Sequence, residues 1–166
     1  TFVKELLTDG KCDIAFLRSE SSSVKEFNSI PYMIDYLTAV LPATHPLAKA
    51  DNLPFEQLRG ETFLLFPEHS FINDLCIREC RNAGFEPHIA YTGNRGATLI
   101  DLVRNGAGIT LMMHHSARQE NDSSLAFIPV TPGIYSYISL NYAKEKPLSP
   151  QAESFVRYVK AHKRDF

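Results

Sequence analysis

The sequence has little of what marks several common classes of protein. It contains no tryptophan and only three cysteines in 166 residues. An odd cysteine count without a regular spacing does not indicate the disulfide framework of a small secreted domain. No segment approaches the roughly 18 consecutive apolar residues of a membrane span. Because no signal peptide precedes the first helix, we expect a protein of the reducing cytoplasm with no membrane association.

The chain also lacks an excess of either charge. Lysine and arginine (17) nearly balance aspartate and glutamate (19), so the formal net charge is −2 and the pI is near 6.3. This balance gives no electrostatic footprint for nucleic acid or for an anionic membrane surface. If the protein acts on DNA, a part outside this sequence makes the contact.

What is present is the composition of a soluble globular protein, with 44% hydrophobic and 22% charged residues. The length allows a sizeable core, in one domain or two small ones. Strands alternate with helices, which favours an α/β chain with mainly parallel pairing. The predicted strands span 12–18, 25–32, 36–42, 62–66, 87–92, 109–113, 125–130 and 135–143, and the predicted helices span 2–9, 55–59, 70–83, 95–105, 114–119 and 149–163.

The sequence offers no motif for catalysis. It has no nucleophile elbow, no phosphate-binding glycine loop and no recognisable Ser-His-Asp or Cys-His arrangement. We therefore expect a protein that is not an enzyme, with no catalytic residue and no cofactor. A metal site is not expected either, because the adjacent His114 and His115 would face opposite ways on a strand.

Three short motifs follow one another along the chain. L-x-x-G-x-x-D-I-A runs from Leu7 to Ala15, V-L-P-x-x-H-P-L from Val40 to Leu47, and L-V-x-x-G-x-G-I from Leu102 to Ile109. Each is weak alone, but their order and spacing are specific. Over essentially its whole length, the chain resembles the effector-binding domain of LysR-type transcriptional regulators.

The resemblance implies a two-lobed, periplasmic-binding-protein-like (type 2) fold with mixed sheets and two hinge crossings. Lobe I would comprise residues 1–42 and 139–166, and lobe II residues 43–138. Family members begin with a winged helix-turn-helix, a linker helix and the first strand and helix of the effector domain, so the sequence resembles a fragment that lacks them. Their absence would leave an open sheet edge in lobe I, and we expect a longer natural chain or a partner chain to cover it.

The function that the resemblance implies is effector sensing for transcription. A small anionic metabolite would bind between the lobes and alter a homodimer or homotetramer, while DNA is contacted only through the absent amino-terminal domain. A solute-binding protein of a transport system is the alternative. An export signal upstream would indicate transport, and a winged helix would indicate regulation.

Arg18 is the leading candidate for a ligand contact, with Ser19 next to it. Arg18 follows a short apolar strand directly, and its guanidinium fork suits a carboxylate or phosphate. The alternative is a surface arginine paired with Glu20 or Glu26. The resemblance supports the first interpretation, because family members that sense aromatic-degradation acids carry an arginine at the corresponding strand end.

Two helix starts supply further candidates. The hydroxyl of Ser70 and the free backbone N–H groups near it could receive an anion, although Ser70 could simply cap the helix. Arg95 opposes the dipole of the helix that it precedes, which favours a functional or interface role, and a solvated surface arginine is the alternative. The residues predicted to contact the ligand at these two places are Pro67, His69 and Ser70, and Asn94, Arg95, Gly96 and Thr98.

Met113 and His114 complete the predicted ligand contacts. They end the strand 109–113, where the family often has a proline that shapes the floor of the pocket. Cys76 and Cys80 are four residues apart on an apolar helix stripe, with Cα atoms about 6 Å apart. We interpret them as small buried hydrophobes, and a redox-sensing pair, as in some relatives, is the alternative.

Overall fold

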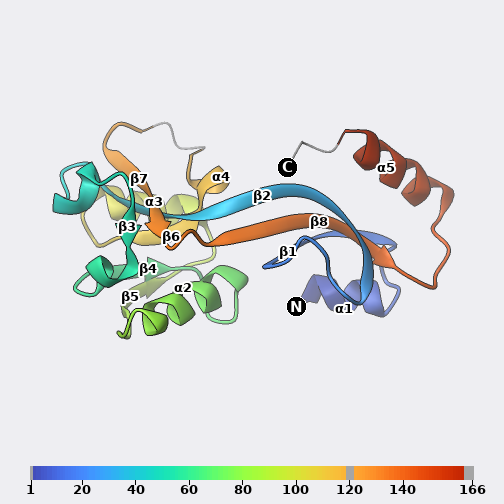
Figure 1. Cartoon of the computed structure of the whole chain (residues 1–166), viewed down its shortest axis with the longest axis horizontal. Coiled ribbons are helices and arrows are strands. Elements are labelled where there is room, and N and C mark those ends of the chain that lie inside the picture. Colours follow the sequence, from blue (N-terminus) through green and yellow to red (C-terminus); the bar gives the residue numbers. More distant parts are fainter. Residues whose placement is uncertain (1, 119–121, 163–166) are drawn as a thin grey trace. The chain divides into compact units, whose positions relative to one another are not determined.

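The computed structural model describes residues 2–118 and 122–162. The chain forms two compact units: unit 1 comprises Thr1–Asp35 and Tyr135–Phe166, and unit 2 comprises Tyr36–Ile134. Figure 1 shows both units along the chain. The chain passes between them twice, between residues 35 and 36 and between residues 134 and 135. Both passages fall earlier in the sequence than the expected lobe boundaries after residue 42 and before residue 139.

The first passage lies inside one long strand, β2 (Phe27–Pro42). The sequence predicted two strands here with a turn between them, and that prediction is wrong. Asp35 interrupts the apolar pattern, yet it is buried and pairs with Arg18. Because a charged residue can stay inside a strand when it has a partner, the strand continues.

Unit 1 is built on the sheet formed by β1 (Ile14–Ser19), β8 (Tyr135–Ala143) and the first part of β2. β8 lies between the other two strands and pairs with β1 in antiparallel register, from Ile14 opposite Tyr142 to Ser19 opposite Tyr137. Among the described strands, β1 pairs only with β8, so its other edge is open. The helices of unit 1 are α1 (Phe2–Thr8) and α5 (Pro150–Ala161), which lie on either side of these strands in Figure 1.

The start of α5 is tied to the start of β1. Ser149 caps the helix by accepting a hydrogen bond from the backbone N–H of Ala152. Its hydroxyl also donates to Asp13 Oδ2 at 2.8 Å, and Lys146 Nζ lies 3.5 Å from Asp13 Oδ1. The hydrogen bond from Ser149 is the main cause of the lowered pKa of Asp13. The aspartate of the first motif therefore joins two elements that are far apart in the sequence.

Unit 2 holds the remaining elements. The second part of β2 pairs in antiparallel register with β6 and β7, whereas β3 with β7 and β4 with β5 are parallel. The larger sheet is mixed and the sheet of β4 and β5 is parallel. The expectation of mainly parallel pairing is wrong for the long ladders, because β2 pairs with strands that run against it. The elements are η1 (Pro46–Lys49), β3 (Leu53–Pro54), η2 (Phe55–Leu58), β4 (Thr62–Leu65), α2 (Phe71–Asn82), β5 (His88–Thr92), α3 (Gly96–Arg104), β6 (Thr110–Met113), α4 (His114–Ala117) and β7 (Leu125–Thr131).

The core of unit 2 consists of two buried clusters. Leu75, Cys76 and Cys80 of α2 are buried in the larger cluster, and Leu99 and Val103 of α3 in the other. Helix α2 thus buries the apolar stripe that the sequence predicted, with Cys76 and Cys80 in it.

The third motif ends in a turn that requires glycine. Gly108 has φ +155°, and a Cβ atom at this position would lie 2.4 Å from the backbone oxygen of Thr62. The turn lets Ile109 N–H donate to that same oxygen at 2.8 Å. The glycine therefore allows β6 to approach β4 closely.

Candidate functional site

Arg18 lies near the end of β1 and is held by two side chains of unit 1. Its Nη1 donates to Ser136 Oγ at 2.6 Å, and both Nη1 and Nη2 lie 3.5 Å from Asp35 Oδ2. The side chain of Arg18 is 22% exposed and that of Asp35 only 2%. Burial lowers the pKa of Arg18 from its ordinary value, and Asp35 opposes that effect. A guanidinium remains charged under such conditions.

The structure shows a partner for Arg18 that the sequence did not suggest. Glu26, one of the two expected partners, pairs instead with Lys4 at 2.7 Å. Asp35 is 17 residues away in the sequence, and its contact with Arg18 depends on how β1, β8 and β2 are arranged. Ser19 is half-buried, and its hydroxyl donates to the backbone oxygen of Ser21 at 2.7 Å, so it stabilises the loop after β1.

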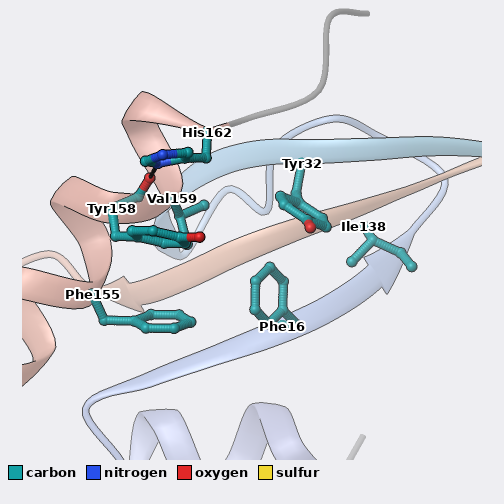
Figure 2. Close-up of a pocket in the computed structure, with 7 residues that line it drawn as sticks. All are labelled: Phe16, Tyr32, Ile138, Phe155, Tyr158, Val159 and His162. Atoms are coloured by element: carbon teal, nitrogen blue, oxygen red, sulfur yellow. Dashed lines mark hydrogen bonds between the residues drawn. The ribbon is translucent and has the colours of Figure 1, made fainter.

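An aromatic groove lies on the same sheet face as Arg18. Phe16 precedes Arg18 by two residues on β1, and Ile138 is directly opposite Arg18 on β8, so their side chains share a face. Figure 2 shows the groove, a cavity of about 350 Å³. Among the residues that the structure describes, its lining includes no lysine, arginine or carboxylate, so these residues offer no fixed counter-charge for an anion. It is formed by Phe16, Tyr32, Ile138, Phe155, Tyr158, Val159 and His162.

In unit 2 the candidate residues lie at the carboxyl ends of the strands. β4 is parallel to β5 and, through Phe63 opposite Ile109, to β6 as well. The carboxyl ends of these three strands therefore point the same way, and α2, α3 and α4 start there. Open α/β sheets commonly bind ligands at the carboxyl ends of their strands.

At the start of α2, the hydroxyl of Ser70 acts as a helix cap. It accepts a hydrogen bond from the backbone N–H of Asn73 at 3.3 Å, as the simpler of the two interpretations had it. The buried Asn73 side chain donates to the backbone oxygen of Phe66 at 2.8 Å and fixes the end of β4. His69 is exposed with φ 63°, a left-handed conformation that is uncommon outside glycine, and Pro67 is half-buried.

At the start of α3, the side chains of Asn94 and Arg95 are exposed. The carbonyl of Arg95 accepts hydrogen bonds from the N–H groups of Thr98 and Leu99, so this residue caps the helix through its backbone. A Cβ atom at Gly96 would lie 3.8 Å from Phe66 Cζ and 3.9 Å from Met112 Cε. These distances show that the start of α3 lies next to the ends of β4 and β6.

The two candidates at the end of β6 have different surroundings. Met113 is fully buried and belongs to the larger core cluster. His114 stacks on Tyr36 with ring centroids 4.3 Å apart, and its Nδ1 lies 3.3 Å from Thr38 Oγ1. Sequence reasoning missed Tyr36 and Thr38, because their proximity to His114 follows from the pairing of β2 with β6. It also missed Phe66, which directly follows β4.

Cys76 and Cys80 are free and completely buried. Burial raises the pKa of Cys76 well above its ordinary value and that of Cys80 to about 12. Because the thiolate is the reactive form, this environment favours buried hydrophobes over a redox pair. Among the described residues, no group of three or more histidine, cysteine, aspartate or glutamate side chains could hold a metal ion.

Comparison with known protein families gives a match over almost the whole chain. A family model, the LysR substrate binding domain, matches residues 1–164. The chain belongs to this family. The resemblance seen in the sequence motifs is thereby confirmed.

Among curated proteins, the transcriptional dual regulator GltC of Bacillus subtilis (strain 168) is 26% identical over 159 residues. The match covers 95% of this chain and 53% of GltC, so the chain spans about half the length of that relative. No helix among residues 2–118 and 122–162 is long and apolar enough to cross a membrane.

Solved structures confirm the fold. The regulatory domain of CcmR from Synechocystis PCC6803, in complex with 2-PG, superposes with a TM-score of 0.87 at 16% identity, covering 99% of this chain and 80% of that one. The effector-binding domain of QuiR, in complex with shikimate, has a TM-score of 0.74 at 21% identity, covering 98% and 79%. The chain therefore has the type 2 periplasmic-binding-protein-like fold.

Proposed function

We propose that this domain senses a small anionic metabolite for a bacterial transcription regulator, and that Arg18 captures the anion. The observation that supports this most is the position of the Arg18 guanidinium, held near the end of a strand and still partly exposed. A partly buried guanidinium binds a carboxylate more strongly than a fully solvated one, because water competes less.

The relatives support the same function. GltC is a transcriptional regulator, whereas a solute-binding protein of a transport system would be expected to match transport components. The regulatory domain of CcmR was solved with 2-PG and that of QuiR with shikimate. Shikimate is a carboxylic acid, so a carboxylate is a reasonable first class of effector to test here.

Unit 2 carries further candidate contacts for an anion at its own strand ends. The free backbone N–H groups at the start of α2, next to Pro67, His69 and Ser70, favour negative charge, as do those of α3. Asn94, Arg95 and Thr98 add polar groups at the second helix start, and Gly96 permits close approach. His114 would offer an imidazole edge or ring face, whereas Met113 is fully buried and would only support the floor.

For the whole regulator, we propose a cytoplasmic homodimer or homotetramer that contacts DNA through a separate domain. The effector would act by binding one conformation of this domain more tightly than another, since a ligand shifts an equilibrium only by its differential affinity. We propose no catalytic step and no cofactor.

The test is a ligand screen followed by one substitution. A thermal-shift screen of small carboxylates, amino acids and aromatic acids should find a stabilising compound, and calorimetry then measures its affinity. Arg18→Ala should weaken binding about 10-fold or more, because a hydrogen bond to a charged group contributes about 1.5–3 kcal/mol. Arg157→Ala, at an exposed arginine of α5, is the matched control.

Arg18→Lys sharpens the result, since it keeps the charge and loses the planar fork. An affinity between those of the wild type and Arg18→Ala would support bidentate capture. Unchanged affinity in Arg18→Ala would remove Arg18 from the site and with it the central assignment.

A further inference from the structure

The contact between Arg18 and Asp35 has an unusual geometry for a buried ion pair. Both Nη1 and Nη2 approach the same oxygen, Asp35 Oδ2, and each lies 3.5 Å away. A side-by-side fork would place two nitrogens against two oxygens at roughly 2.7–2.9 Å. The guanidinium therefore retains hydrogen-bonding capacity that a better-placed carboxylate could use.

The two partners also differ in access. The side chain of Arg18 is 22% exposed, so an incoming anion can reach the guanidinium. The side chain of Asp35 is only 2% exposed and so depends strongly on groups inside the protein. A buried carboxylate that loses a cationic partner is destabilised unless its surroundings rearrange.

The residues that hold Arg18 are next to both passages between the units. Asp35 is the last residue of unit 1 on β2, and Ser136 is the second residue of β8 after the chain returns. Just beyond these points, Leu37 N–H donates to the carbonyl of Ile134 at 2.8 Å. Through two side chains, Arg18 thus contacts both strands that connect the units.

We propose that Asp35 is an internal carboxylate that occupies Arg18 in the ligand-free domain, and that an effector carboxylate acts by replacing it. Asp35 is then a positioning residue: it aims the guanidinium and couples its occupancy to the two connecting strands. The inference rests on the proposed function, because it takes Arg18 as the contact for the anion. It adds the route by which binding at Arg18 reaches β2 and β8.

The first experiment needs no ligand. Hydrogen–deuterium exchange of segments 33–37 and 134–138 is compared between the wild type, Asp35→Asn and Arg18→Gln. Exchange should rise about 10-fold or more in each variant, and the double variant should add little, because both changes break one shared contact. Glu26→Gln, which breaks the exposed pair of Glu26 with Lys4 in the same unit, should leave these segments unchanged.

Ser136→Ala is a milder control that separates loss of the contact from loss of folding. It removes the 2.6 Å acceptor of Arg18 without changing any charge, so a smaller rise in exchange, confined to the same two segments, is expected. Unchanged exchange in Asp35→Asn, or fully additive effects of Asp35→Asn and Arg18→Gln, would overturn the proposal.

The second experiment uses acetate as the probe and acetamide as its neutral counterpart, at constant ionic strength. In the wild type, acetate but not acetamide should raise exchange in both segments. In Asp35→Asn, acetate should bind several-fold more tightly, because the internal competitor is gone, and should change exchange little further. Raised exchange in the variants without any acetate response in the wild type would support the internal contact and would count against anion binding at Arg18, the proposed function.

Discussion

The two units of the molecule are stabilised in different ways. Unit 2 has two clusters of buried apolar residues that include α2, α3 and most of its strands. Among the described residues, the cluster of unit 1 has four buried members, Ile30, Leu140, Val156 and Val159. Phe16, Phe155 and Tyr158 of unit 1 remain 42%, 43% and 59% exposed. Unit 2 therefore depends mainly on apolar burial, and unit 1 much less so.

Polar contacts take a larger part in unit 1. Asn141 is fully buried: its Oδ1 accepts from Ser29 at 2.6 Å, and its Nδ2 donates to the backbone oxygen of Ser139 at 2.7 Å. The contacts of Arg18 with Asp35 and of Asp13 with Ser149 belong to the same unit. A hydrogen bond adds little net stability when it forms, but a buried donor or acceptor left without a partner is costly. Unit 1 is thus the unit in which a ligand that competes for polar partners can have a large effect.

The largest difference between the units should appear in the free energy of unfolding when a buried core side chain is truncated to alanine. Phe63→Ala in unit 2 removes a fully buried ring from the larger cluster and should lower the free energy of unfolding by about 3–5 kcal/mol. Val156→Ala in unit 1 should lower it by only about 1–2 kcal/mol. Urea unfolding monitored by circular dichroism gives both values. Equal losses would show that the core of unit 1 contributes more than its size indicates.

Thiol reactivity should separate the units next. In the native protein, the half-buried Cys12 of unit 1 should react with an aromatic disulfide reagent, whereas Cys76 and Cys80 of unit 2 should not. With the pKa of Cys80 raised from 9.0 to about 12, its thiolate fraction is about 1,000-fold lower at neutral pH, before burial slows access further. All three should react after unfolding. In the Cys12→Ser variant only Cys76 and Cys80 remain. Fast reaction of these thiols with the reagent in the folded protein would contradict the prediction and support the redox interpretation.

Substitution of the serine that caps one helix in each unit should give the smallest effect on stability, and it compares two residues of the same type. Ser70→Ala should cost about 1 kcal/mol, since Ser70 only caps α2. Ser149→Ala should cost more, because Ser149 both caps α5 and donates to Asp13. Thermal unfolding compares the two. Aspartate, a good cap, should rescue position 70 but not position 149, where it would face Asp13; rescue at both positions would limit Ser149 to capping.

Local patterns in the sequence predicted most individual elements. Helices α2, α3 and α5 lie within one or two residues of their predicted ends, because an apolar stripe, a capping serine or a following glycine acts within a few residues. The ordered motifs predicted the family and its fold, which the family match and the solved structures confirm. The expected ligand contacts stay a prediction, with Ser70 in a capping role and Met113 in the core.

The sequence by itself determined where most helices and strands form and which family the chain belongs to, because these depend on short-range patterns and motif order. Only the tertiary structure decided that β2 is one strand, that its ladders are antiparallel, and that Asp35 and Ser136 hold Arg18. Those contacts join residues up to 118 positions apart. They exist because strands distant in sequence pair side by side, and no local pattern encodes which strands will meet.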